Sequence, residues 1–152
     1  MNDSLARRAG AIALLCLAAL ASAQEGPQKL AQVRLNAGIH NINAELASTP
    51  QQREIGLMFR TAMPANDGML FAFEQPAQQC FWMRNTLIPL DMIFVRQDGT
   101  IARIATAQPL DETTVPSGEP ISMVIEIRGG RAAELGIAEG DKVNPPPLCC
   151  KP

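Results

Sequence analysis

Hydrophobic and polar residues alternate along several short stretches of this chain. The alternation is clear at 32–35 and 122–127 and partial at 39–46. A period of two is typical of β-strands with one buried face. Short apolar runs bounded by turn-forming residues predict further strands at 69–73, 79–85, 91–96, 100–107 and 142–143. About seven or eight short strands predict a mostly-β domain, either a small barrel or a sandwich.

Two short segments break the strand pattern and predict helices. Thr49 would cap a helix over 50–58, because Pro50 then takes the first helical position. A second short helix is expected at 131–135. Asp98 and Gly99 predict a tight hairpin turn, and a loop is expected at 109–120. Helices are therefore minor elements of the expected fold.

The N-terminal residues are typical of an export signal. Arg7 and Arg8 precede an uncharged stretch at 9–20, which is shorter than the ~20 residues of a membrane-spanning helix. Ala21-Ser22-Ala23 then offers a signal-peptidase site. We expect a signal peptide at 1–23, a leader at 24–30, one globular domain at 31–144 and a flexible Pro/Cys tail at 145–152. The mature protein would be periplasmic or secreted, the alternative being retention through an N-terminal anchor.

Composition and charge exclude several classes of function. The net charge is −2, so no basic excess points to nucleic acid or to an anionic membrane. The chain has one His and no Tyr, which excludes metal sites built from several histidines. No phosphate-cradling Gly-rich loop is present. We therefore expect no metal, no cofactor, no nucleic-acid partner and no membrane insertion after signal cleavage.

Sulfur-containing residues leave two questions open. Cleavage after Ala23 would remove Cys16 and leave Cys80, Cys149 and Cys150, an odd number that cannot pair completely. Cys80 could bridge to a tail cysteine, or all three thiols could stay free. The six methionines of the mature chain are spread through apolar segments, which favours core filling over copper binding.

The segment 81–91 reads Phe-Trp-Met-Arg-Asn-Thr-Leu-Ile-Pro-Leu-Asp. It resembles the signature of a bacterial and archaeal family known as domain of unknown function 192, in which Phe-Trp-Met-Lys/Arg-Asn-Thr is followed by one variable residue and Ile-Pro-Leu-Asp. Residues 53–60 and 67–71 resemble the family's first block, and residues 124–130, Gly136 and Gly140-Asp141 resemble its last one. The resemblance covers about residues 31–144. It implies a compact, mostly-β fold in a family whose members are often exported, and it implies no activity.

The same segment gathers most of the polar residues that could bind a ligand. Arg84 could stack over Trp82, the only tryptophan, or hold a carboxylate. Arg60 and Arg84 could form an anion-binding pair balanced by Asp91. The candidate ligand-binding residues are Arg60, Trp82, Arg84, Asn85, Thr86 and Asp91. The alternative is structural: these side chains could pair with one another, cap turns or fill the core.

Three functions remain compatible with these residues. The first is a non-enzymatic binding or accessory module of the cell envelope, with a site for a small polar or anionic ligand or a peptide. The second is an envelope enzyme in which Asp91 acts as base and Arg84 stabilises charge. Asp67, Glu74, Asp91 and Glu126 could also supply paired carboxylates. The third is a structural or stress-related envelope protein.

Overall fold

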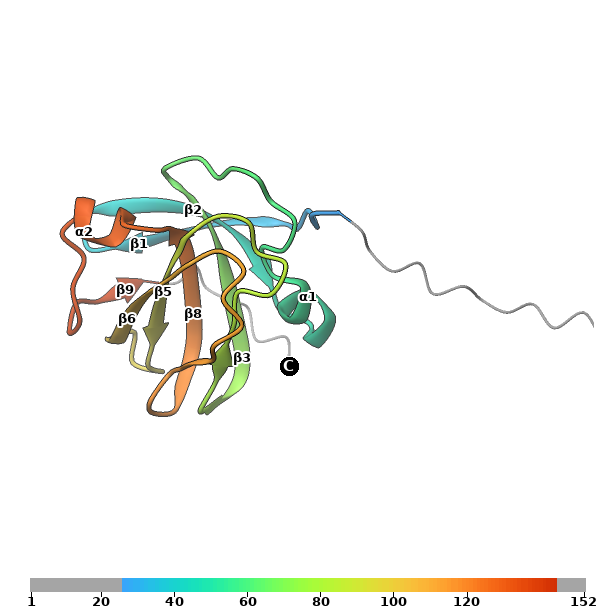
Figure 1. Ribbon diagram of the computed structural model, residues 1–152. Helices are drawn as coiled ribbons and strands as arrows, with labels where there is room; N and C mark the ends of the chain where they lie inside the picture. The colour runs from blue at the N-terminus through green and yellow to red at the C-terminus, as the bar shows by residue number, and fades with distance from the viewer. Residues whose placement is uncertain (1–25, 145–152) are drawn as a thin grey trace, which may run out of the picture.

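The computed structural model describes residues 26–144, which form nine strands and two short helices (Figure 1). The strands are β1 (Gln32–Ala37), β2 (His40–Ala47), β3 (Asp67–Ala77), β4 (Cys80–Phe81), β5 (Leu90–Val95), β6 (Ile101–Ala107), β7 (Val115–Pro116), β8 (Ile121–Arg128) and β9 (Val143–Asn144). The helices are α1 (Pro50–Ile55) and α2 (Arg131–Glu134). The prediction of a mostly-β domain with two short helices is confirmed.

Seven strands form one sheet in the order β6-β5-β8-β3-β2-β1-β9, and β4 pairs with β7 in a small second sheet. The large sheet curls into an open half-barrel (Figure 1). Neighbouring strands are antiparallel except β2 and β3, which run parallel. A parallel pair needs a crossover connection, and α1 lies within the one that joins β2 to β3.

The strands β5 and β8 and residues 68–71 of β3 are buried on both faces, whereas β3 is exposed from Glu74 onward. Ile93 on β5 and Ile125 on β8 belong to an apolar cluster shared with β1, β2, β9 and α2. Phe94 and Val124, one position along, belong to a second cluster on the opposite face. Every residue of β5 is buried. A polar side chain on either face of these strands therefore lies in the interior.

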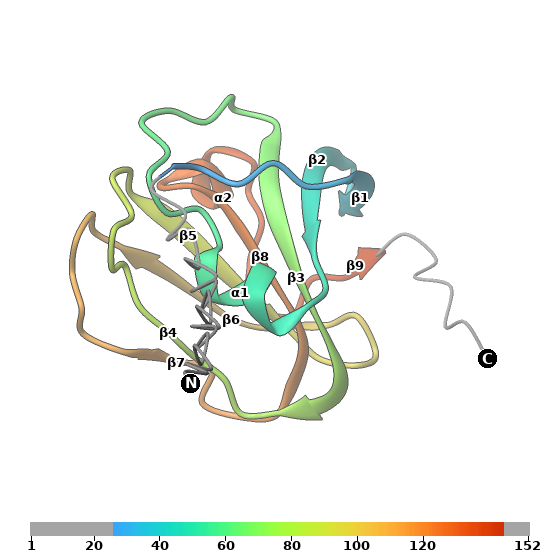
Figure 2. The same cartoon turned by 90° about the vertical axis from the view of Figure 1, so that its right-hand side faces the viewer.

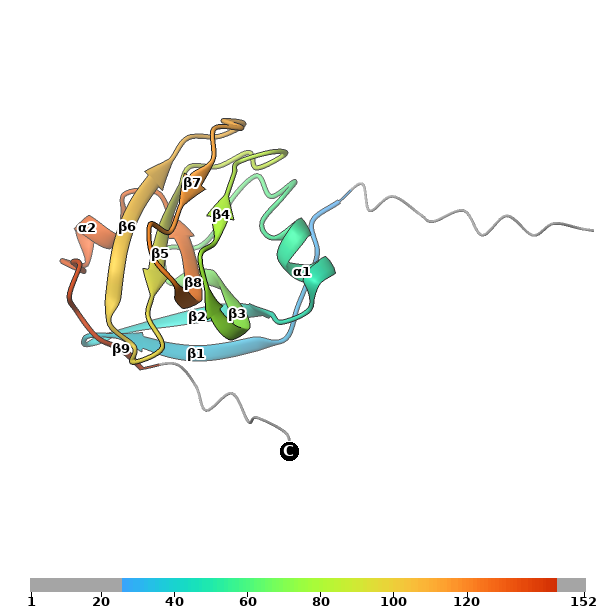
Figure 3. The same ribbon diagram turned by 90° about the horizontal axis from the view of Figure 1, so that it is seen from below.

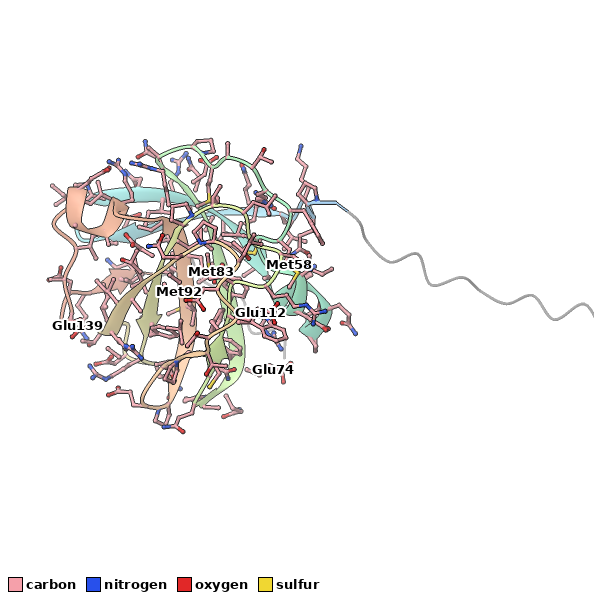
Figure 4. All side chains as sticks on the ribbon, in the orientation of Figure 1. Met58, Glu74, Met83, Met92, Glu112 and Glu139 are labelled. Atoms are coloured by element: carbon pink, nitrogen blue, oxygen red, sulfur yellow. The ribbon has the colours of Figure 1, made fainter. Side chains whose placement is uncertain are left out.

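The second cluster is covered by α1, by β4 and by the chain that follows β4. Figure 2 shows α1 in front of the large sheet, and Figure 3 shows the small sheet lying across β5 and β8. Met83 and Met92 lie near the middle of the molecule and Met58 beside α1 (Figure 4). Met63, Met69, Met83, Met92 and Met123 are buried, which confirms core filling for these five.

Three element boundaries differ from the sequence prediction. The strand expected at 79–85 ends at Phe81, and Asn85 takes a left-handed conformation with φ 53° that no strand can hold. The helix expected at 50–58 ends at Ile55, because Gly56 with φ 49° turns the chain away. The loop expected at 109–120 contains β7, whose partner is β4.

The two ends of the chain lie outside the described residues. The signal peptide therefore stays a prediction. So does a bridge from Cys80 to Cys149 or Cys150. Cys80 is exposed and has no disulfide partner among residues 26–144. Within residues 26–144, no helix has the length and hydropathy needed to cross a membrane.

Candidate functional site

A cavity of about 520 Å³ lies between α1, the chain around β4 and the central sheet. It opens on the side of the second apolar cluster. Its lining comes from three parts of the chain: Pro50, Arg53, Glu54, Ile55, Gly56, Leu57 and Met58 from the α1 segment, Gln79, Cys80, Phe81, Trp82 and Thr86 from the β4 segment, and Phe71, Phe73 and Glu126 from the sheet. Four of these side chains are aromatic, so the walls are largely apolar.

Local sequence fixes the wall that α1 contributes. Thr49 caps the helix, and its hydroxyl accepts the backbone N–H of Gln52 while the Gln52 side chain accepts that of Thr49. Gly56 ends the helix directly against the sheet. A Cβ at this position would lie 3.2 Å from the ring of Phe71, and its positive φ favours glycine. The helix therefore closes tightly on β3.

Phe81 forms the opposite wall and joins it to the sheet. Its ring meets Phe71 edge to face at 5.1 Å between centroids and Phe94 at 5.9 Å. Phe71 on β3 and Phe94 on β5 each oppose Val124 on β8. Phe81 therefore lies over one cross-strand row of the sheet, and Glu126 from the adjacent row lines the cavity.

Glu126 belongs to that adjacent row. Its direct neighbours across the sheet are Met69 on β3 and Met92 on β5, both fully buried. Glu126 itself is only 4% exposed, and it makes no side-chain hydrogen bond or ion pair with any residue in the described part of the chain. Burial alone raises the pKa of the Glu126 carboxyl to about 8. A carboxyl group without a protein partner therefore lines the cavity.

The carboxyl of Glu126 is not sealed inside the protein. Among the described residues, the buried side-chain atoms that lack any partner are Arg60 Nε and Ser122 Oγ. The Glu126 oxygens are not among them, because they face the cavity. A buried polar group that faces open space is completed by what enters that space.

Trp82 and Arg84 lie at the edge of this cavity. Trp82 lines it and is 42% exposed. The guanidinium carbon of Arg84 lies 5.6 Å from the centroid of the Trp82 ring, which confirms the expected stacking. The pair lies in the loop after β4 and not on a strand.

Asn85 and Thr86 connect this loop to the α1 segment. Asn85 accepts the backbone N–H of Phe59 at 2.8 Å through its carbonyl, and its side-chain amide approaches Met58 Sδ at 3.9 Å. Thr86 is buried, lines the cavity and donates its hydroxyl to the Arg84 carbonyl at 3.3 Å. Thr86 therefore reaches the site, whereas Asn85 shapes the turn that carries it.

Arg60 lies elsewhere, and the structure does not pair it with Arg84. Its Nη1 lies 2.8 Å from Glu45 Oε1, and its Nη2 donates to the Gln28 carbonyl at 2.8 Å. Burial acts to raise the pKa of Glu45, but hydrogen bonds from Arg60 and from Leu30 N–H, with attraction to Arg60 and Lys29, outweigh it and lower that pKa. The Arg60 charge is neutralised internally, which removes the basis for an Arg60–Arg84 anion site.

Asp91 also lies apart from the cavity. It is 1% exposed and accepts hydrogen bonds from Thr106 Oγ1 at 2.7 Å, Gly130 N at 3.0 Å and Ala132 N at 2.8 Å. These bonds hold the start of α2, where Gly130 offers no side chain as a cap. The surroundings of Asp91 are those of a structural carboxylate and do not suit a catalytic base.

Arg53 and Glu126 are the cavity residues that sequence reasoning undervalued. Arg53 donates to the carbonyls of Ser48 at 2.6 Å and Ala72 at 2.9 Å, and its guanidinium carbon lies 5.1 Å from the centroid of the Phe73 ring. Glu126 is one of the four acidic residues that the sequence offers as possible paired carboxylates. Its signal is its position in an alternating strand that lies in a sheet buried on both faces.

Among the described residues, no cluster of His, Cys, Asp and Glu is arranged to hold a metal ion.

These features define a small mostly-β domain with a half-barrel sheet and one lateral cavity that contains a buried carboxyl. A family model matches residues 31–145, and the chain belongs to that family, DUF192, whose description is Uncharacterized ACR. No curated protein matches the chain.

Two solved structures are similar over most of this chain. One is a protein of Sinorhizobium meliloti 1021, provisionally named a transcription regulator, with 38% identity and a TM-score of 0.75. The match covers 79% of this chain and 98% of that one. The other is a protein of unknown function from Novosphingobium aromaticivorans DSM 12444, with 46% identity and a TM-score of 0.73. This second match covers 76% of this chain and 86% of the Novosphingobium protein.

Proposed function

We propose that this protein is an exported, non-enzymatic binding module of the cell envelope, and that it holds a small polar ligand in the cavity beside α1. The observation that carries the proposal is Glu126. A carboxyl that is 4% exposed, lines a cavity and has no partner among residues 26–144 lowers the stability of the fold. A ligand that hydrogen-bonds to it would recover that cost. Apolar walls with one oriented polar group are typical of small-molecule sites.

Binding fits the cavity better than catalysis by paired carboxylates. That chemistry needs a second carboxyl facing the first at a fixed distance. The other acidic residue of the lining, Glu54, is exposed on α1. The remaining charged residue of the lining, Arg53, is held by two backbone carbonyls and by Phe73. Glu126 is thus the buried carboxyl of the lining, whereas Glu54 and the Cys80 thiol are exposed, and a single buried carboxyl suits recognition.

A thermal-shift screen of small polar compounds on the purified protein tests this proposal. Ligands of the cavity should raise the melting temperature of the wild type by a few degrees at concentrations well above Kd. Cys80→Phe places a large ring at an exposed position of the lining and should abolish that rise. Arg34→Phe, at an exposed position on β1, is the matched control and should keep it. Equal stabilisation of both variants would place the ligand elsewhere.

Export is proposed from the sequence of residues 1–23. If the signal is cleaved after Ala23, the mature protein begins at Gln24. Mass spectrometry of the protein from the extracytoplasmic fraction should give that N-terminus. A cytoplasmic protein with an intact N-terminus would contradict export and leave the cavity proposal standing.

The name of the Sinorhizobium relative suggests transcription regulation as a second function. A domain that binds DNA directly needs a basic face. The net charge of this chain is −2, so we do not extend that name to it.

A further inference from the structure

The residues that line the Glu126 cavity also indicate the charge of its ligand. We infer that it selects a small organic ammonium ion, which the Glu126 carboxylate holds among the aromatic walls. This inference rests on the proposed function, since it names the ligand class of the same cavity. Three observations support it. Glu126 has no partner among the described residues, the walls of the cavity are aromatic, and the cation of the lining, Arg53, already donates to two backbone carbonyls.

The missing partner is a hydrogen-bond donor or a positive charge. No element packed around Glu126 in the described part of the chain supplies one to it. Met69 and Met92 flank it in the sheet, and neither can donate. The β4 segment contributes four polar lining residues, Gln79, Cys80, Trp82 and Thr86, and none of them hydrogen-bonds to Glu126. The Thr86 hydroxyl already donates to the Arg84 carbonyl. From α1, Arg53 donates to two carbonyls, and Glu54 is an acid.

The walls are suited to a cation. Phe71, Phe73, Phe81 and Trp82 all line the cavity. The negative face of an aromatic ring attracts an ammonium ion, most strongly for tryptophan and most of all where water is displaced. Guanidinium groups already use two of these rings, with Arg53 over Phe73 and Arg84 over Trp82. Aromatic walls next to a buried carboxylate supply both interactions that an organic cation needs.

Binding would couple to one proton. The Glu126 carboxyl is largely protonated at neutral pH, because burial raises its pKa to about 8. An ammonium ion favours the carboxylate, so one proton leaves to solvent for each cation bound at neutral pH. Affinity for a cation should therefore rise with pH through this range. A neutral ligand that accepts a hydrogen bond from the protonated carboxyl, or an anion, should show the opposite trend.

Three probes of equal shape separate these cases: choline, its uncharged analogue 3,3-dimethylbutan-1-ol, and 3,3-dimethylbutanoate. Trp82 is the only tryptophan and the chain has no tyrosine, so its fluorescence reports on the cavity without interference. Choline should bind more tightly than both analogues. Its Kd should fall about tenfold from pH 7 to pH 9, because a group of pKa about 8 is roughly one-tenth ionised at the first pH and nine-tenths at the second.

Glu126→Gln keeps the size of the side chain and removes its charge. It should lose the preference for choline and the pH dependence, whereas Glu74→Gln, on the exposed part of β3, should keep both. If Glu126→Gln does not fold, calorimetry of the wild type in two buffers of different ionisation enthalpy measures the released proton directly. Close to one proton per choline at pH 7 is expected.

Equal affinity for choline and the alcohol, or tighter binding of the butanoate, would overturn the inference and leave a small-molecule site in place. Absence of binding by all three probes would also overturn it. The proposed function is judged separately by the thermal-shift screen with Cys80→Phe. The two failures are therefore distinguishable.

Discussion

Ala132 donates its backbone N–H to the Asp91 carboxylate over 2.8 Å, and this bond ties β5 to the first turn of α2. Gly130 N–H and the Thr106 hydroxyl bind the same carboxylate. Asp91 thus supplies, from a distant strand, the cap that the sequence next to α2 lacks. Asp91, at the end of the segment 81–91, is structural, while Phe81 and Trp82 at its beginning line the cavity.

Replacing Asp91 should therefore destabilise the fold without acting on the cavity. Asp91→Ala leaves the buried Ala132 N–H and the partly buried Gly130 N–H without an acceptor, and we expect a loss of about 2–4 kcal/mol in the free energy of unfolding. Urea denaturation followed by Trp82 fluorescence measures it. Glu112→Ala, at an exposed position, is the control and should change stability by less than about 0.5 kcal/mol. A loss for Asp91→Ala as small as that of the control would contradict the structural assignment.

Gly68 is a second position where the fold around Glu126 can be tested. A Cβ on Gly68 would lie 2.5 Å from the carbonyl oxygen of Glu126, so β3 and β8 would have to separate. We expect Gly68→Ala to cost at least about 2 kcal/mol. Gly26→Ala meets nothing within 4 Å and should leave stability nearly unchanged. Similar melting temperatures for the two variants would show that the strands are less closely packed than described.

Much of this fold could be predicted from local sequence. The alternation at 122–127 identifies β8, and Thr49 with Pro50 identifies the start of α1, because both signals depend on neighbouring residues alone. The stacking of Arg84 on Trp82 could also be expected from their spacing. The pair nevertheless lies in the loop after β4, because the strand expected at 79–85 ends at Phe81.

The candidate site was harder to predict because it depends on contacts between distant segments. Arg60 and Arg84 are similar in sequence context, yet Glu45, 15 positions before Arg60, neutralises only the first. Nothing near Glu126 in the chain indicates that its neighbours would be two methionines. That arrangement follows from the register of β8 with β3 and β5.

The raised pKa of Glu126 predicts an unusual dependence of stability on pH. The folded-state pKa of about 8 lies above the ordinary value of 4.5, so the folded state keeps a proton that the unfolded state releases. Ionisation of the Glu126 carboxyl therefore costs no stability below about pH 4.5. The free energy of unfolding then falls as pH rises toward 8. We expect wild type to lose about 3–5 kcal/mol relative to Glu126→Gln across this range.

Urea denaturation of both proteins at several pH values between 5 and 8 measures this difference. Glu74→Gln controls for the loss of an exposed charge and should follow the wild type. Parallel stability curves for wild type and Glu126→Gln would mean that the pKa of Glu126 is the same in the folded and unfolded states, and would contradict this prediction.

The titration of the Glu126 carboxyl carbon, followed by ¹³C NMR and assigned by its loss in Glu126→Gln, tests most directly whether this group lies buried and unpaired at the cavity. A midpoint near pH 8 in the free protein is the predicted result. A midpoint near 4.5, the ordinary value for a glutamate, would mean that water or a protein donor already satisfies the carboxyl, and would contradict the assignment of this cavity as a site that a ligand completes.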